Sequence, residues 1–510
     1  MYSKSFSAML LGVSVKLIDV EVDISGGLPQ FQIIGLASKA IAEAKQRVAV
    51  AMQSSGFELV PKKILVNLCP ADMKKEGPQF DLAIAALLLK NFNYVKATAN
   101  FFSNSCFIAE LTLTGDLKKV KGLMSFILDS VKLGVKNIFL AKEAEADLQI
   151  LKDHPELLKE TNLYLVKDLK ELVTALNDQA VLERFSIKNS RCSDNQQENN
   201  SKDINSDQVL FEDIIGQSQA KRALEIAVAG RHNLLMVGPP GCGKSLLAKA
   251  VKSIVPKLSV EKALETQRIR ELASFSDFNQ DILDIPYRAP HNSCSPVSLV
   301  GGSIPVTPGE VSLAHNGILF LDELAEFNRF TLDQLRVILD NKKVALNKGI
   351  YKYEYPADFI LIAATNPCPC GYYGDLKRNC ICSMKQIQRY ISKISGPLLD
   401  RIDIVIHLKR LDTKERELLS KASSGITKSS DILQKIEKVK EFTKKTNLDS
   451  SLDKESRDLL ARAVESFDLS ARAHTKLIKL ARTIANLDFS KNIKQEHLAE
   501  AIQYREDFHI

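Results

Sequence analysis

The segment GPPGCGKS combines residue types and spacing that suit the binding of a nucleotide phosphate chain. Its glycines allow backbone N–H groups to turn toward phosphate oxygens, and it lies between an apolar run, LLMV, and a helix-like run, LLAKAVKSIV. We expect Lys244 to reach the β- and γ-phosphates of ATP and Ser245 to bind Mg²⁺. The alternative, a Gly/Pro turn without a ligand, is disfavoured by the strand–loop–helix order. The predicted nucleotide contacts are Gly238, Pro239, Pro240, Gly241, Cys242, Gly243, Lys244 and Ser245.

A second chemical signal stands in GILFLDEL, where an apolar run is followed by Asp322 and Glu323. A buried strand should not end in two adjacent carboxylates unless they have partners. Asp322 suits Mg²⁺ through its water shell, and Glu323 suits the base that orients an attacking water. The alternative is a strand that runs out into an acidic surface turn.

Two further polar residues follow apolar segments. FILIAATNP ends in Asn366, whose amide could hold the attacking water beside the nucleotide. SGPLLDRID carries Arg401, which could reach the γ-phosphate of a neighbouring subunit as an arginine finger. For Arg401 a surface salt bridge with Asp400 or Asp403 remains an equal alternative.

Four of the nine cysteines lie close together in the sequence, at Cys368, Cys370, Cys380 and Cys382. Four thiolates within fifteen residues could close a tetrahedral zinc site of structural type. Their spacing differs from the common C-x₂-C pair, so reduced cysteines that pack a loop are the alternative.

These residues belong to a chain of 510 residues, for which length alone predicts two to four domains. Residues 186–208 are rich in Asn, Ser, Asp and Gln and predict a flexible linker. The linker separates an N-terminal α+β domain, 1–180, from an α/β core, 209–407, and a helical lid, 408–510. In the first domain, FIAELTLTGDL, Phe107 to Leu117, is expected to form one alternating strand.

The composition constrains the class of protein. The chain is 45% apolar and 26% charged, as soluble globular proteins are, and no apolar run approaches the roughly 20 residues that span a bilayer. We therefore expect a cytoplasmic protein without a membrane partner. The net charge of +7 permits a nucleic-acid partner without requiring one.

The segments IIGQ, GPPGCGKS, GEVSLAHNGILFLDELAEF, AATNPCPCGYYGD and SGPLLDRID together resemble the YifB/ComM family of bacterial AAA+ ATPases, related to magnesium chelatase subunits and to the MCM helicases. The resemblance covers essentially the whole chain. It implies a P-loop AAA+ core with a helical lid, assembled as a hexameric ring. It also implies that Asn366 is the sensor-1 residue, Arg401 the finger and Arg472 the sensor-2 residue. One departure is Asn292, where relatives often carry His, and no role is assigned to it.

A lysine-rich hairpin is expected from Lys342 to Pro356, with a turn at Asn347-Lys348-Gly349. In related helicases a hairpin at this place enters the central pore. Lys348, at the tip, would then contact single-stranded or branched DNA, with charge added by Lys342, Lys343 and Lys352. The alternative is an exposed hairpin that does not bind DNA, on which lysines prevent aggregation.

The N-terminal domain resembles the proteolytic domain of Lon. The turn KEGPQ places Gln79 where Lon carries its nucleophilic Ser, and ELTLTGDLKKVKGLMSF places Phe126 where Lon carries its general-base Lys. A carboxamide cannot serve as the nucleophile and Phe126 cannot take a proton, so we predict a non-proteolytic domain.

The family resemblance implies a DNA helicase that promotes branch migration in recombination during natural transformation. A chelatase-type ATPase that remodels a protein and has no DNA substrate is the principal alternative. An ATP-dependent protease conflicts with Gln79 and Phe126, and a nucleotide sensor without turnover is disfavoured by Glu323.

Overall fold

The computed structural model describes residues 1–36, 38–187, 209–273, 281–302, 306–348, 351–375, 377–410, 428–445, 452, 454–466 and 471–506. From residue 188 onward, the linker expected over 186–208 lies outside these ranges. The chain forms two compact units. The first comprises Met1–Glu198, Gln267–Ile282 and Asn347–Glu354, and the second comprises Asn199–Thr266, Leu283–Leu346 and Tyr355–Ile510.

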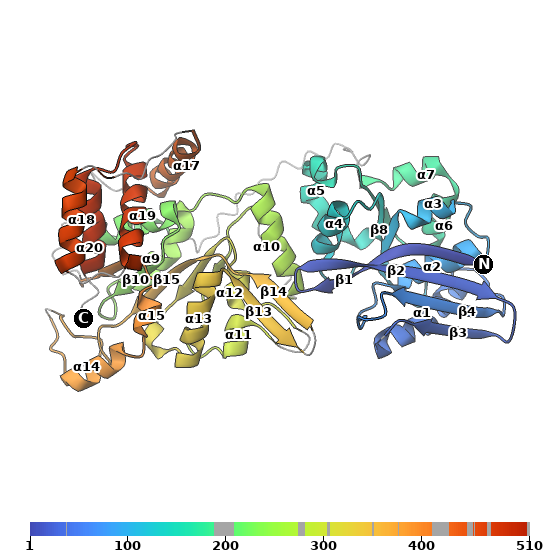
Figure 1. Ribbon diagram of the computed structural model, residues 1–510, viewed down its shortest axis with the longest axis horizontal. Coiled ribbons are helices and arrows are strands. Elements are labelled where there is room, and N and C mark those ends of the chain that lie inside the picture. Colours follow the sequence, from blue (N-terminus) through green and yellow to red (C-terminus); the bar gives the residue numbers. More distant parts are fainter. Residues whose placement is uncertain are drawn as a thin grey trace. The chain divides into compact units, whose positions relative to one another are not determined.

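The first unit is built on a seven-stranded mixed sheet of order β3-β4-β2-β1-β5-β8-β9, in blue and cyan in Figure 1. β2 pairs antiparallel with β1 and with β4, whereas β5, β8 and β9 run parallel to one another. Alternate residues of β2 are buried, as its alternating sequence predicts. The strands are β1 (Tyr2–Leu11), β2 (Ser14–Ser25), β3 (Gln30–Ile34), β4 (Lys63–Cys69), β5 (Ser105–Ile108), β6 (Glu110–Leu111), β7 (Leu117–Lys118), β8 (Asn137–Ala141) and β9 (Asn162–Val166).

Helix α2 (Asp81–Asn91) is the central helix of this unit, because every residue from Asp81 to Leu89 is buried. Such a helix is apolar on all sides and belongs to a core. The other helices are α1 (Lys39–Ser54), α3 (Ala99–Ser103), α4 (Leu123–Lys132), α5 (Gln149–Asp153), α6 (Leu169–Asn177) and α7 (Gln179–Arg184).

The prediction of a single strand from Phe107 to Leu117 is wrong. The chain forms β5 and then the short antiparallel pair β6 and β7. Between that pair, the backbone N–H of Asp116 donates to Thr112 Oγ1 at 3.0 Å, and Gly115 has a φ of +90°. These features make a tight turn that an uninterrupted alternating pattern does not reveal.

The second unit contains a five-stranded parallel sheet of order β11-β12-β15-β10-β16 (Figure 1). The central strands are buried along their whole length, which explains why their sequences are uniformly apolar rather than alternating. The strands are β10 (Leu234–Val237), β11 (Tyr287–Arg288), β12 (Ile318–Leu321), β15 (Ile360–Thr365) and β16 (Ile404–His407). The chain is thus a mixed α/β protein with a parallel sheet in the second unit.

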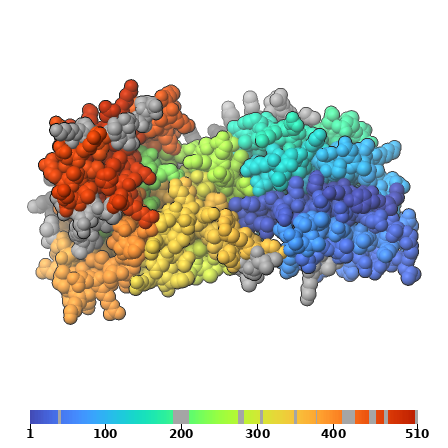
Figure 2. Space-filling view, viewed as in Figure 1, coloured from blue at the N-terminus to red at the C-terminus, as the bar shows by residue number. Residues whose placement is uncertain are grey.

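The remaining helices belong to or extend from the second unit. The described chain beyond residue 428 contains no sheet strand, in line with the helical pattern expected there. The helices are α8 (Ser218–Gly230), α9 (Lys244–Ala250), α10 (Val260–Leu272), α11 (Pro296–Val300), α12 (Glu310–Leu313), α13 (Arg329–Asn341), α14 (Met384–Ile391), α15 (Gly396–Leu399), α17 (Ser429–Lys445), α18 (Lys454–Ser466), α19 (Ala471–Leu487) and α20 (Gln495–Glu506). After residue 428, α17 packs against α19, and α18 and α19 pack against α20; this part of the chain is coloured red in Figure 2.

The lysine-rich segment forms the hairpin β13 (Lys343–Lys348) and β14 (Tyr351–Pro356). The turn is shifted from its expected position, because Asn347 and Lys348 are the last residues of β13. Gly349, Ile350 and the side chain of Lys348 lie outside the described part of the chain.

Candidate active site

The carboxyl ends of three adjacent parallel strands bring the predicted catalytic segments to one edge of the second sheet. Val237 is in register with Thr365, and Leu321 is in register with Ala363. The glycine-rich loop, Asp322 and Asn366 follow these strand ends directly. Ligands of parallel sheets bind at this edge, so the strand order positions the site.

Lys244 lies at the start of α9 and is buried. Its Nζ donates to Gly238 O at 2.6 Å, to Pro239 O at 3.1 Å and to Asn366 Oδ1 at 3.2 Å. Burial lowers the pKa of Lys244, and the neighbouring Cys242 thiol and Asp322 carboxylate oppose that shift. The predicted phosphate-binding lysine and the predicted sensor amide are therefore in direct contact.

Ser245 and Asp322 also meet, because Ser245 Oγ donates to Asp322 Oδ2 at 2.6 Å. A hydroxyl and a carboxylate are oxygen ligands of the kind that Mg²⁺ prefers, so this pair fits the predicted metal. The glycine-rich loop around them requires glycine at Gly241 and Gly243, whose φ angles are +79° and +98°.

Glu323 has a left-handed backbone with a φ of +53°, a conformation that is costly for a residue other than glycine. Its backbone N–H donates to Asp322 Oδ1 at 2.9 Å, and its side-chain Oε2 accepts a hydrogen bond from Asn292 Nδ2 at 2.7 Å. Asn292 lies between β11 and α11 and was given no role by the sequence reasoning. It fixes the orientation of the carboxylate predicted to act as base.

Two other residues that contact the glycine-rich loop were not predicted from the sequence. Gln217 Nε2 donates to Cys242 O at 3.3 Å and to Lys409 O at 2.8 Å, and Arg410 Nη2 donates to Pro240 O at 2.9 Å. Gln217 stands in the IIGQ segment, which contributed to the family resemblance and could have suggested a role. Arg410 stands in no recognised motif.

Arg401 and Arg472 form a second group. Both guanidinium groups contact the carboxylate of Asp340, with the closest atoms of Arg401 at 2.5 Å and of Arg472 at 3.3 Å. The surface salt bridge considered for Arg401, to Asp400 or Asp403, is not formed. In the part of the chain that the structure describes, neither arginine contacts the group around Lys244.

The four clustered cysteines lie together, with all their sulfur atoms within 4.8 Å of one another. The Sγ of Cys368 is 3.4 Å from that of Cys370 and 3.7 Å from that of Cys380. Tetrahedral zinc with Zn–S bonds of about 2.3 Å would separate its sulfurs by about 3.8 Å, so the cluster fits zinc.

The cysteine loop packs against the predicted nucleotide site. A Cβ added at Gly371 would lie 2.7 Å from Pro240 Cδ and 3.9 Å from Asn366 Cγ. The loop that follows Asn366 is therefore in contact with the glycine-rich loop through a residue without a side chain.

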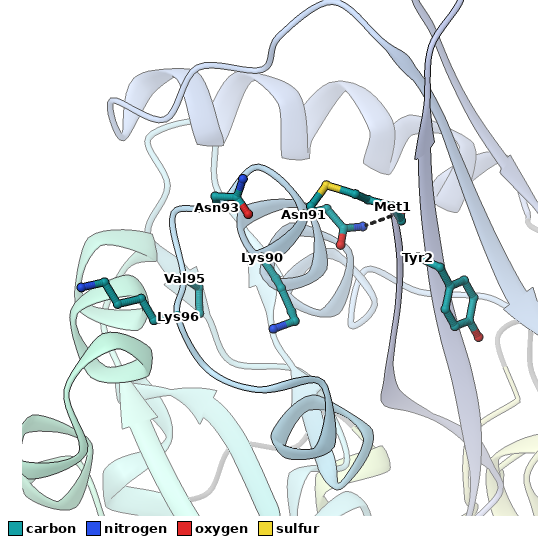
Figure 3. A pocket seen from close by; sticks show the side chains of 7 residues that line it. All are labelled: Met1, Tyr2, Lys90, Asn91, Asn93, Val95 and Lys96. Carbon is teal, nitrogen blue, oxygen red and sulfur yellow. Dashed lines mark hydrogen bonds between the residues drawn. The ribbon is translucent and has the colours of Figure 1, made fainter.

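The first unit offers no peptidase dyad at the predicted positions. The Gln79 side chain donates to Glu76 O at 2.9 Å within its own turn, and Phe126 is a buried core residue. A cavity of about 480 Å³ lies elsewhere in this unit, between the start of β1 and the end of α2 (Figure 3). Lysines and asparagines line it, and its lining contains no nucleophile paired with a base.

Three family models match the chain. The model for magnesium chelatase, subunit ChlI, matches residues 210–416, and one for subunit ChlI of Mg-chelatase matches residues 20–144. A third, for the C-terminal part of that subunit, matches residues 433–505. No described helix is long and apolar enough to cross a membrane.

Individual relatives match over nearly the whole length. Competence protein ComM of Haemophilus influenzae is 37% identical over 518 residues, which cover 98% of this chain and 96% of that protein. The uncharacterised protein YifB of Escherichia coli is 38% identical, over 97% of this chain and 95% of its own. Lon protease 2 of Bacillus subtilis is 28% identical over 193 residues, which are 34% of this chain and 35% of that protein.

Proposed function

Because the chain belongs to the ComM/YifB family of magnesium-chelatase-like AAA+ proteins, we propose that it is an ATP-hydrolysing ring motor that acts on DNA. The observation that carries the ATPase proposal is the contact network at one edge of the parallel sheet. It joins Lys244 to Asn366, Ser245 to Asp322 and Asn292 to Glu323. Each of these residues except Asn292 suits one task of phosphoryl transfer.

The residues divide the work as follows. Lys244 and the backbone of the glycine-rich loop bind the β- and γ-phosphates, and Glu323 orients the attacking water and accepts its proton. Asn366 responds to the presence or loss of the γ-phosphate and transmits this difference to β15, the strand that it follows. Ser245 and Asp322 would hold Mg²⁺, which when bound neutralises charge on the phosphate oxygens.

Arg401 acts on the nucleotide of the next subunit in a ring, which we propose to be hexameric. Its separation from the group around Lys244 supports this assignment, because a finger that completes its own site should lie near it. A head-to-tail ring brings the arginine of one copy to the phosphates of another.

The cysteine cluster holds a structural zinc ion in this proposal, through Cys368, Cys370, Cys380 and Cys382. Four protein ligands leave no open coordination position, so the ion would serve the loop and not the reaction. Because Gly371 of this loop lies against Pro240, an ion held by the four cysteines would stiffen the proposed nucleotide site.

DNA is proposed as the substrate because a competence protein is among the similar proteins and because a lysine-rich hairpin follows α13 in the chain. Lys342 already forms an ion pair, since its Nζ lies 3.2 Å from Asp358 Oδ1. Lys348, near the end of the hairpin, is therefore the stronger candidate for phosphate contact. The specific activity proposed is branch migration of recombination intermediates during natural transformation.

The test is ATP hydrolysis with no DNA, with single-stranded DNA and with four-way-junction DNA, using Glu323→Gln as the inactive control. Stimulation by DNA that disappears in Glu323→Gln is the expected result and would justify a branch-migration assay. Hydrolysis that is indifferent to every DNA would instead favour a chelatase-type motor that remodels a protein.

A further inference from the structure

Asp340 is the meeting point of two arginines that come from distant parts of the sequence. It lies in the last turn of α13, whereas Arg401 follows α15 and Arg472 belongs to the first turn of α19. Arg401 Nη2 donates to Asp340 Oδ2 at 2.5 Å and its Nε is 3.2 Å from both carboxylate oxygens. Arg472 Nη2 donates to the other oxygen, Oδ1, at 3.3 Å.

These contacts fix the plane of the Arg401 guanidinium. Asp340 binds the Nε and Nη2 side as a fork, and Pro397 O accepts from Nη1 at 2.6 Å. Among the described residues, the contacts use one N–H on each of the three nitrogens, which leaves one on Nη1 and one on Nη2. Asp340 therefore orients the group, and two of its five N–H bonds remain for phosphate oxygens.

The local charge remains positive. Arg401, Arg472 and Arg336 all lower the pKa of Asp340, with the hydrogen bond from Arg401 as the largest cause, so the carboxylate is ionised. The carboxylate is in contact with two guanidinium groups, those of Arg401 and Arg472. In addition, a carboxylate in the last turn of a helix is disfavoured by the helix dipole. An ordinary surface ion pair would need neither the third arginine nor this unfavourable position.

We propose that Asp340 is a positioning residue that holds Arg401 and Arg472 side by side, so that both serve the γ-phosphate bound by the neighbouring copy of the chain. This inference rests on the proposed ring and adds one assignment to it. Asp340 makes the two arginines one unit.

The test uses mixed rings. A Lys244→Ala subunit lacks its own phosphate site but keeps its arginines, whereas an Arg401→Ala subunit has the reverse defect. In an equal mixture, about a quarter of the head-to-tail interfaces pair an intact site with intact arginines, so activity should recover to about a quarter of the wild-type value.

Asp340→Asn should behave like Arg401→Ala, with an intact phosphate site and defective arginines. Alone, we expect kcat to fall about 10- to 100-fold, as for a misplaced catalytic group, while the affinity for a fluorescent ADP analogue stays within about twofold. Mixed with Lys244→Ala, it should recover activity; mixed with Arg401→Ala, it should not. Arg472→Ala should show the same pattern of recovery. Asp333→Asn, an exposed acid on the same helix, is the matched control and should retain wild-type activity.

The outcomes separate this inference from the one on which it depends. If Lys244→Ala and Arg401→Ala fail to complement each other, the proposed ring arrangement is wrong, and this assignment falls with it. If they do complement but Asp340→Asn recovers with neither partner, Asp340 has only a structural role. An increase in activity for Asp340→Asn would mean that the carboxylate restrains the arginines, which also overturns the proposal.

Discussion

At the scale of single residues, the hydrogen bond from Asn292 orients the carboxylate of Glu323, the proposed base. We predict that Asn292→Ala lowers kcat about tenfold, because a carboxylate free to rotate is less often aligned with the attacking water. Nucleotide affinity should not change, since Asn292 contacts no residue of the glycine-rich loop. Steady-state hydrolysis and ADP-analogue binding measure the two quantities. Asn292→His, which keeps a ring N–H donor, should lose less, and an equal loss in both variants would contradict the assignment.

The cysteine cluster gives a second residue-level prediction. The purified protein should contain about one zinc per chain, measured by elemental analysis, and Cys380→Ser should lose it. Because the loop adjoins Pro240, loss of the ion should also weaken nucleotide binding. Cys294→Ser, outside the cluster, is the control and should keep the metal. Wild-type protein prepared without chelators that contains no zinc would refute the prediction.

Functional residues could be predicted from the sequence where they belong to one contiguous motif. Their contact partners could be predicted only where those partners lie in the same motif. GPPGCGKS identifies Lys244 and Ser245 because its chemistry is concentrated in eight residues. Asn292 and Asp340 could not be found this way, since each is a common residue type whose partner lies far along the chain. Only the fold brings such pairs together.

At the scale of elements, Asp403 ties α19 to the sheet. Its carboxylate lies 2.7 Å from Lys476 Nζ and accepts from the backbone N–H of Asn233 at 2.9 Å. Burial would raise the pKa of Asp403, but the His232 ring, whose Nδ1 lies 3.8 Å away, and the charge of Lys476 outweigh it and lower the pKa to about 2. The ionised carboxylate is therefore a stabilising contact between helix and sheet.

We predict that Asp403→Asn lowers the unfolding free energy of this unit by about 2 kcal/mol at pH 7. The folded pKa is below the ordinary value near 3.9, so the stabilisation is complete above about pH 5 and is lost as pH falls toward about 2. Urea unfolding at several pH values should show the difference between the two proteins shrinking over that range. The exposed neighbour Asp400→Asn is the control, and a difference independent of pH would contradict the electrostatic origin.

The elements were predictable to different degrees. Uniformly apolar runs such as LLMV gave the buried parallel strands, because both faces of such a sheet are covered. The broken strand between Phe107 and Leu117 was missed, since its turn depends on the backbone of Gly115 and on a hydrogen bond from Asp116 to Thr112. An alternating pattern of apolar and polar residues does not show where the pairing between strands ends.

At the scale of the whole molecule, DNA contact should be separable from ATP hydrolysis. We predict that Lys348→Ala abolishes most stimulation by DNA and leaves basal hydrolysis within about twofold, because phosphate contacts contribute binding and not chemistry. Lys352→Ala, whose Nζ is paired with Glu354 at 2.7 Å, is the comparison variant and should lose less stimulation. The measurement is hydrolysis against DNA concentration at several salt concentrations. Full stimulation by DNA in Lys348→Ala would place the DNA elsewhere.

Helix α19 carries both Arg472 and Lys476, one turn apart on the same face. Lys476 is tied to Asp403 and Arg472 to Asp340, and near the other end of the helix Thr483 Oγ1 lies 2.8 Å from His232 Nε2. The last turns of α19 are also buried, with Leu480, Ile484 and Leu487 in the core. The helix is therefore held along its whole length. A displacement of the C-terminal helices would have to carry Arg472 with it, so the position of this guanidinium group is coupled to the packing of the whole helical part.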